Sequence, residues 1–158
     1  MSVLIRQARE ADAPQMSALL TEILKIWNSN RPSDPAHVNA HYITHPHSIA
    51  CSVAEESGEI LGFQSLKRAW DGNPYDVPKG WGIIGSYVRS DMAGRGIGRQ
   101  LFARSNEAAR TAGLIAIDAT IAEDNAPGLA YYDAMGFETY RTKPGAICKA
   151  YRLNTSPA

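Results

Sequence analysis

Residues 87–101, Tyr-Val-Arg-Ser-Asp-Met-Ala-Gly-Arg-Gly-Ile-Gly-Arg-Gln-Leu, contain the end of a predicted strand, a glycine-rich turn and the start of a predicted helix. Three glycines stand at alternate positions, Gly94, Gly96 and Gly98. They let the backbone turn with positive φ and leave no side chain between the backbone amides and a ligand. The helix N-terminus adds a partial positive charge, and two arginines in the turn add full charges. The segment therefore predicts a binding site for a phosphate or a diphosphate.

Composition limits what the rest of the molecule can be. The chain has 158 residues, of which 44% are hydrophobic and 20% are charged, so we expect one domain over residues 1–158 with a substantial core. Sixteen basic and sixteen acidic residues cancel, which leaves no overall field to attract nucleic acid or an anionic membrane. The sequence shows no signal peptide pattern and no apolar run of membrane-spanning length, so we expect a cytoplasmic protein.

The hydrophobic pattern alternates between strand and helix periods. The first half is predicted to contain a strand at 3–8, a helix capped by Asp12 with Pro14 in its first turn and Trp27 on its apolar side, a short helix at 35–43, and a hairpin of 49–55 and 60–67. An exposed loop at 69–80 follows. The second half is predicted to contain a strand at 81–89, a helix at 98–112 ended by Gly113, a strand at 114–122, a helix at 126–135, and strands at 138–143 and 147–153. The strand and helix order through residues 81–137 implies a right-handed crossover and a locally parallel strand pair beside an antiparallel hairpin. The fold class is therefore mixed α/β.

Two common nucleotide-binding folds do not fit the glycine turn. A Rossmann domain places its glycines as G-x-G-x-x-G, whereas this turn has G-x-G-x-G with Arg99 at the third glycine site. The residues after Gly98 are also too few for the usual Rossmann sheet. A Walker A loop requires a Gly-Lys-Ser/Thr ending, which is missing here. A smaller phosphate-binding fold remains.

Two motifs taken together resemble the signatures of the GNAT N-acetyltransferase superfamily. They are Tyr-Val-x5-Gly-Arg-Gly-Ile-Gly-x2-Leu from Tyr87 and Glu-Asp-Asn-x6-Tyr-Asp-x2-Gly-Phe from Glu123. The resemblance is close over 81–143 and holds only in outline before it. It implies a mostly antiparallel mixed sheet of about six to seven strands, about four helices and a splayed parallel strand pair. One departure is Ala93, where the family often has Arg or Gln.

The resemblance implies acetyl-CoA as acetyl donor, with the backbone amides of residues 94–99 holding its diphosphate and no metal ion. The residues implied in cofactor binding are Tyr87, Val88, Arg89, Gly94, Arg95, Gly96, Ile97, Gly98, Arg99, Asn125 and Tyr132. Two of these side-chain roles have a plain alternative. The arginines could simply be solvated at a helix end, and Asn125 is equally well placed to cap the helix that follows it, with Pro127 in the first turn.

By the same resemblance, Tyr132 lies at the position of the family's general acid, and the Val88 amide could stabilise the oxyanion of the reacting carbonyl. The alternative for Tyr132 is simple packing against the cofactor, and packing is the expected role of Tyr131. No residue stands out as the general base. Ser86 could position a water molecule, and two acidic residues that flank the neighbouring strand, Asp118 and Glu123, are also open candidates.

All four histidines lie between His37 and His47, and three of them are spaced by four residues, which places them on one helical face. With no cysteine or acidic residue beside them we expect a surface stripe and no physiological metal site. The resemblance places this helix beside the acceptor site. The candidate acceptor-binding residues are Trp27, His41, Tyr42, Trp70 and Ser86.

The predicted function is direct acetyl transfer to the amine of a small molecule, with a homodimer as a further expectation. Two other functions stay open, a non-catalytic acyl-CoA sensor and an acetyltransferase for protein N-termini or lysines. A covalent acyl-cysteine route is disfavoured because Cys51 and Cys148 lie far from the motifs, in strand-like stretches where buried, reduced thiols are expected.

Overall fold

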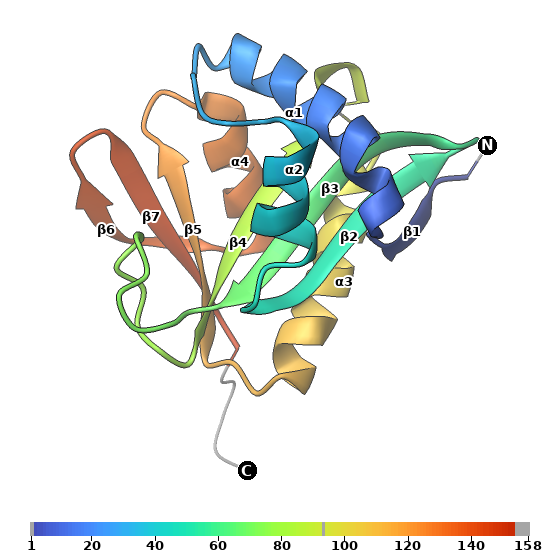
Figure 1. Ribbon diagram of the computed structural model, residues 1–158. Coiled ribbons are helices and arrows are strands. Elements are labelled where there is room, and N and C mark those ends of the chain that lie inside the picture. Colours follow the sequence, from blue (N-terminus) through green and yellow to red (C-terminus); the bar gives the residue numbers. More distant parts are fainter. Residues whose placement is uncertain (1, 93, 154–158) are drawn as a thin grey trace.

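The computed structural model describes residues 2–92 and 94–153, and Ala93, the one departure from the family motif, lies outside the described residues. Seven strands form one sheet in the order β1-β2-β3-β4-β5-β7-β6 (Figure 1). The strands are β1 (Leu4–Gln7), β2 (Ser48–Glu56), β3 (Glu59–Arg68), β4 (Trp81–Val88), β5 (Ala116–Ala122), β6 (Glu138–Lys143) and β7 (Ala146–Arg152). All neighbours pair antiparallel except β4 and β5, which are parallel. The mixed, mostly antiparallel sheet is confirmed.

Helices cover both faces of the sheet. They are α1 (Ala13–Ile26), α2 (Pro35–Val38), which continues as a π-helical turn over Asn39–Ile43, α3 (Ile97–Thr111) and α4 (Ala126–Met135), with single 3-10 turns at Glu10–Asp12 and Ser90–Met92. Figure 1 shows α1 and α2 in front of the sheet and α3 behind it. Apolar side chains of α1 and α2 pack with β2, β3 and β4 in one core, while α3 and α4 pack with β5 in a second. Among the described residues no helix is long and apolar enough to cross a bilayer.

The start of α1 differs from the expectation in one detail. Asp12 precedes the helix, but its carboxylate does not cap it. Instead Oδ2 accepts from the Arg9 amide at 2.7 Å and from the Arg6 guanidinium at 2.8 Å, and Arg6 also binds Glu55. Arg6 donates two charge-assisted hydrogen bonds to the two carboxylate oxygens of Asp12, a bidentate arrangement that fixes the side chain away from the helix end. Asp12 therefore helps to join β1, α1 and β2.

The loop between β3 and β4 is irregular as predicted, but the expectation that it is exposed is wrong in part. Val77 is only 4% exposed and packs in a small cluster with Ala69 and Ile83. Asn73 organises the turn, because its side chain donates to two loop carbonyls and accepts from two loop amides. The Tyr75 carbonyl accepts hydrogen bonds from two basic side chains of β6. The loop is therefore docked on the end of the sheet.

Candidate active site

The site begins at a gap between the two parallel strands. β4 and β5 pair only where Trp81–Ile83 lie beside Ala116–Asp118. Beyond these residues β4 stays paired with β3 as far as Val88, and β5 stays paired with β7 as far as Ala122. Each strand follows its own half of the sheet, so the two diverge (Figure 1). The splayed pair that the sequence predicted is confirmed.

The Val88 amide points into this gap. The next amide, that of Arg89, donates to the Leu61 carbonyl on β3 at 2.9 Å. Successive amides along a strand point to opposite sides, so the Val88 N–H faces away from β3 and toward β5. A main-chain donor therefore lines the opening, at the position where the sequence predicted one.

At the wide end of the gap the glycine turn leads into α3. Gly94 has φ +85° and Gly96, which caps the helix, has φ +78°. These are left-handed conformations that glycine adopts without strain, as predicted. A β-carbon built on either residue would meet no atom within 4 Å. The backbone is thus open on the ligand side, and this fits a bound diphosphate.

Gly98 has a different backbone conformation from the one expected. It lies in the first turn of α3, and its φ is outside the left-handed region. A β-carbon there would stand 2.6 Å from Cε1 of Tyr131. An aromatic ring of α4 therefore occupies the space that a side chain at this position would need. The expectation of a third glycine with positive φ is wrong.

The arginines near the turn differ in how they are engaged. The Arg95 guanidinium binds Glu56 at 2.7 Å, and Arg89 binds both Glu59 and Asp91. Arg99 is exposed and makes no side-chain hydrogen bond to the described residues. Arg99 is therefore the arginine best placed to contact a phosphate without first breaking an ion pair.

Tyr132 reaches the gap from α4. That helix starts where the Asn125 side chain accepts from the Gly128 amide at 3.1 Å, so the capping role predicted for Asn125 is present. Tyr132 is 6% exposed, and its hydroxyl lies 2.7 Å from the hydroxyl of Ser86 on β4. Burial raises the pKa of the phenol well above its ordinary value. The hydroxyl therefore keeps its proton at neutral pH, which a general acid requires.

A chain of hydrogen bonds runs behind Tyr132. The Tyr131 hydroxyl donates to the Gly98 carbonyl at 2.7 Å and accepts from Nε2 of Gln64 at 3.0 Å. The same Nε2 donates to Ser86 at 2.8 Å, and Oε1 of Gln64 accepts from Ser105 at 2.6 Å. The expectation that Tyr131 only packs is thus incomplete, because its hydroxyl joins α4 to the first turn of α3.

On the opposite face of β4, aromatic side chains and a cation gather. Tyr87 packs against Phe63 and Tyr42, with ring centroids 4.9 and 5.7 Å apart, and Trp27 lies 5.9 Å from Tyr87. Arg31 donates to the hydroxyls of Tyr87 and Tyr42 at 2.9 and 3.2 Å. The structure thus brings together two predicted acceptor residues, Trp27 and Tyr42, around a cation that the sequence analysis did not identify.

A second cation lies on the same face. Lys67 of β3 is 3% exposed, and its Nζ is 3.3 Å from Nε2 of His41. Burial lowers the pKa of Lys67 to about 8 and that of His41 to about 4. His41 is therefore neutral near pH 7 and accepts a hydrogen bond from the lysine. His41 thus contacts Lys67 in the region where the sequence predicted an acceptor site.

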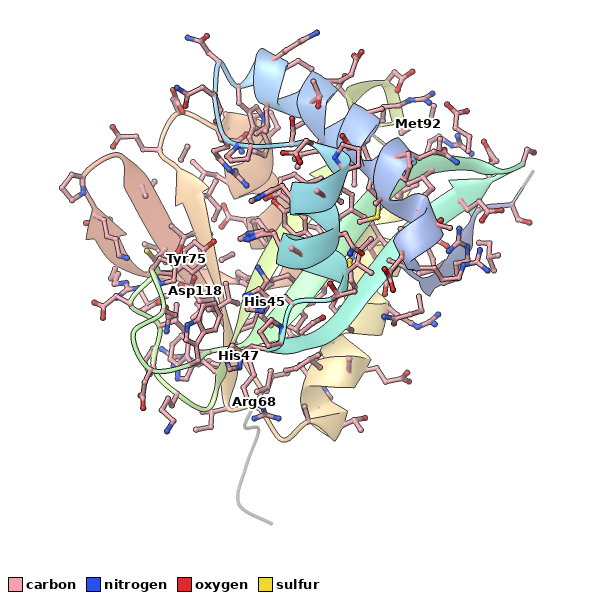
Figure 2. All side chains as sticks on the ribbon, in the orientation of Figure 1. His45, His47, Arg68, Tyr75, Met92 and Asp118 are labelled. Atoms are coloured by element: carbon pink, nitrogen blue, oxygen red, sulfur yellow. The ribbon has the colours of Figure 1, made fainter. Side chains whose placement is uncertain are left out.

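The remaining histidines form a column that ends at Trp70. His37 stacks on His41 at 4.9 Å, and His47 stacks on Trp70 at 4.8 Å with His45 beside them. Figure 2 shows His45 and His47 together at the lower end of the segment that follows α2. Within the described residues no group of three or more His, Cys, Asp or Glu side chains could hold a metal ion. Trp70 belongs to this column and makes no ring contact with Tyr42 or Tyr87.

The two acidic candidates for the general base have different surroundings. Asp118 is fully buried; its Oδ1 accepts from Tyr140 at 2.6 Å and its Oδ2 from Thr120 at 2.8 Å. Burial raises the pKa of this carboxyl group. Figure 2 shows Asp118 near Tyr75 of the docked loop. Glu123 is exposed just beyond the end of β5. Asp118 therefore has both oxygens engaged inside the protein.

Both cysteines are free and buried, as predicted. Burial raises the pKa of the Cys51 thiol to about 12, so it stays protonated and is a poor nucleophile. This agrees with the expectation that no acyl-cysteine is formed.

Three residues of the candidate site were not expected from the sequence, namely Arg31, Gln64 and Lys67. The last two were detectable in principle, because they interrupt the otherwise apolar run of β3 and are almost fully buried. A polar side chain inside a buried strand needs partners, and so it marks a place where the strand faces something polar. Arg31 lies in a turn-rich stretch where nothing distinguishes it from a solvated side chain.

Comparison with known proteins assigns the class of this fold and site. The family model described as acetyltransferase (GNAT) family matches residues 16–137, and the chain belongs to this family. The match spans most of α1 and all of α2, the glycine turn and α4. The enzyme class that the two motifs predicted is confirmed.

Two curated relatives share much of the sequence. An L-methionine sulfoximine/L-methionine sulfone acetyltransferase from Pseudomonas aeruginosa is 33% identical over 147 residues, which cover 87% of this chain and 81% of the relative. The L-amino acid N-acyltransferase MnaT from Escherichia coli is 27% identical over 139 residues, which cover 84% and 78%. Among solved structures, yncA from Salmonella typhimurium with its cofactor acetyl-CoA has a TM-score of 0.78 at 24% identity, covering 100% of this chain and 98% of that one. The fold is therefore shared over the whole chain.

Proposed function

We propose that this protein is an acetyl-CoA-dependent N-acetyltransferase that acetylates the amine of a small amino acid, with Tyr132 as the general acid. The observation that carries the proposal is the buried Tyr132 hydroxyl, held 2.7 Å from Ser86 where β4 has already separated from β5. The names of both curated relatives support an amino acid as acceptor, since each states an amino acid or an amino acid derivative as substrate.

The residues present fit acetyl-CoA. Gly94 and Gly96 leave open space over the backbone at the N-terminus of α3, where amides and the helix dipole favour a diphosphate. Arg99 would add a charge there, and the Val88 amide would offer a donor farther along the gap. In this proposal the pantetheine arm follows β4 toward Tyr132. An extended arm can pair with β4 because its main-chain groups in the gap have no partner on β5.

The transfer needs one proton to reach the departing sulfur. Acetyl-CoA supplies an acetyl group on a thioester; the amine nitrogen bonds to the acetyl carbon, the carbon–sulfur bond breaks, and the Tyr132 proton goes to sulfur. The amine loses a proton to solvent, and solvent returns a proton to the Tyr132 oxygen, so that the enzyme is unchanged after each turnover. A positioned acid of this kind contributes roughly 10²–10⁴ in rate.

The hydrogen-bond chain behind Tyr132 sets the direction of that proton. Tyr131 must donate to Gly98, because a carbonyl can only accept, and so the Tyr131 oxygen accepts from Gln64. Ser86 likewise accepts from Gln64, which leaves the Ser86 proton available to the Tyr132 oxygen. Tyr132 then accepts from Ser86 and directs its own proton into the gap. In this proposal Ser86 is a positioning residue for the acid, and the acceptor contact predicted for it stays a prediction.

The test is thiol release from acetyl-CoA with a panel of free amino acids that includes L-methionine sulfone, together with polyamines and short peptides. We expect release with one or more free amino acids and little with the peptides. CoA binding without release across the panel would overturn the proposal and favour an acyl-CoA sensor. Preference for a peptide N-terminus or lysine would overturn the acceptor class alone.

A further inference from the structure

Arg31 is a cation that the protein holds with phenols instead of a carboxylate. Its Nη2 donates to Tyr87 at 2.9 Å and to Tyr42 at 3.2 Å, and within the described residues no Asp or Glu lies in ion-pair distance. The two tyrosines are 7% and 2% exposed, whereas Arg31 as a whole is exposed. One end of the guanidinium is therefore fixed on buried hydroxyls while the residue stays accessible from solvent.

Lys67 lies close to the same position. Its Nζ is 5.4 Å from the centre of the Tyr42 ring, and within the described residues it too has no carboxylate partner. Burial lowers the pKa of Lys67 to about 8, and the charge of Arg31 contributes to the lowering. Burying an ammonium group without an anion is unfavourable. Arg31 and Lys67 repel each other across Tyr42. An anion bound between them would offset this repulsion and stabilise both charges.

This pair of cations lies across β4 from the proposed acid. The Tyr87 ring folds back along the strand, since its hydroxyl is 3.5 Å from the position of a β-carbon on Gly85. Gly85 precedes Ser86, and neighbouring strand residues point to opposite faces. Arg31 is thus anchored over β4 on one face at the level where Ser86 holds Tyr132 on the other. At that level the gap between β4 and β5 is open.

We propose that Arg31, with Lys67 and the two phenols, binds the carboxylate of the acceptor, so that the enzyme selects α-amino acids. This inference rests on the proposed function. A guanidinium offers two parallel donors to a carboxylate. The amine of an α-amino acid is bonded to the same carbon as its carboxylate, so anchoring the carboxylate over Gly85 directs the amine into the gap. An amine without an adjacent carboxylate lacks this anchor.

The experiment compares Arg31→Gln with the wild type on matched substrate pairs. L-methionine sulfone, L-methionine and L-phenylalanine are each offered as the free acid and as the carboxamide, with saturating acetyl-CoA. We expect the wild type to prefer the acids. In Arg31→Gln the KM for the acids should rise by about 10- to 100-fold, with kcat and the KM for the carboxamides nearly unchanged. Arg31→Lys should lie between, because it keeps the charge and loses the paired donors.

Arg104→Gln is the matched control, because Arg104 is an exposed arginine of α3 whose guanidinium, within the described residues, donates a hydrogen bond to the Ile5 carbonyl alone. It should behave as wild type. The carboxylate site would be overturned if Arg31→Gln raised the KM for the acid and the carboxamide equally, or if it left the KM for the acid unchanged. Should the wild type release no thiol at all, the proposed function fails, and calorimetry of the same pairs on CoA-loaded protein still tests the site. The carboxylate site is supported if the wild type binds the acid more tightly than the carboxamide and Arg31→Gln loses this preference. Equal affinity of the wild type for the acid and the carboxamide overturns the site.

Discussion

The carbonyl of Gly98 accepts a 2.7 Å hydrogen bond from the hydroxyl of Tyr131, and the ring of the same tyrosine fills the space beside the Gly98 α-carbon. Through this contact the first turn of α3, which follows the glycine turn, is joined to α4, which carries Tyr132. A change at Gly98 therefore acts on the placement of the proposed acid.

Gly98→Ala should destabilise the protein through Tyr131. The new β-carbon lies 2.6 Å from the ring, which two hydrogen bonds hold in place, so the ring cannot move away freely. Overpacking of this kind costs about 1–3 kcal/mol, partly offset by the better helix propensity of alanine. Urea unfolding of Gly98→Ala, Tyr131→Leu and the double variant checks this. We expect the double variant to be more stable than additivity predicts; simple additivity would show that the ring is not the cause.

Tyr132→Phe should lower kcat while leaving CoA affinity within a few fold. The variant keeps the ring in the core and removes only the hydroxyl that donates the proton, so a loss of about 10²-fold is expected. Tyr151→Phe is the control, since Tyr151 packs in the same core and its hydroxyl contacts Asn106, away from the gap. Equal kcat in Tyr132→Phe and wild type would exclude Tyr132 as the acid.

Gly96→Ala should weaken CoA binding more than it weakens the fold. The residue has φ +78°, so alanine adds strain of about 1–2 kcal/mol, but its β-carbon meets no protein atom. The β-carbon would instead stand on the open side of the turn, and we expect CoA affinity to fall at least about tenfold by calorimetry. Gly113→Ala is the matched control, because Gly113 follows the other end of α3 with φ +75° and equally open surroundings. Comparable CoA affinity in the two variants would contradict the phosphate-turn assignment.

Lys67→Met should stabilise the protein at neutral pH and weaken acceptor binding. The folded-state pKa of Lys67 is about 8 against an ordinary 10.5, so the unfolded state binds more protons between these values. The free energy of unfolding of the wild type should therefore rise between pH 8 and pH 10.5. Below pH 8 the folded protein carries the buried charge, and the stability that its loss provides is absent. The pH-dependent change in the free energy of unfolding that Lys67 can cause is about 3 kcal/mol at most. Urea unfolding of both proteins at pH 7 and 9.5 should show the advantage of the variant shrinking as pH rises.

Lys149→Met is the control for this prediction. Lys149 is 6% exposed, like Lys67, but its Nζ lies 2.7 Å from an Asp133 oxygen. Removing a buried lysine that is paired with a carboxylate should cost stability. Removing one that lacks a carboxylate partner among the described residues should not. A destabilised Lys67→Met would mean that the lysine is already satisfied within the protein and is not kept for a ligand.

Local signals predicted most of the chain's elements. The helix at 126–135 and the strand at 138–143 have the predicted bounds, because Asn125 and Pro127 mark the helix start and Gly136 adopts the left-handed conformation that ends it. The strand predicted at 147–153 lies one residue earlier, at Ala146–Arg152. The helix predicted at 35–43 has these bounds but changes to π-helical geometry at Asn39, a change that no local pattern signals.

The sequence by itself determined the motif, and through it the fold class, the family and the glycine turn, because glycine spacing, helix caps and alternating apolar residues act over a few neighbouring positions. It also placed Tyr132 and Ser86 on their elements. Only the tertiary structure decided that Gly98 is small for Tyr131, that Gln64 orients Ser86, and that Arg31 reaches Tyr87. Those partners lie 33, 22 and 56 residues apart, and such pairs meet only when the sheet and its covering helices have packed.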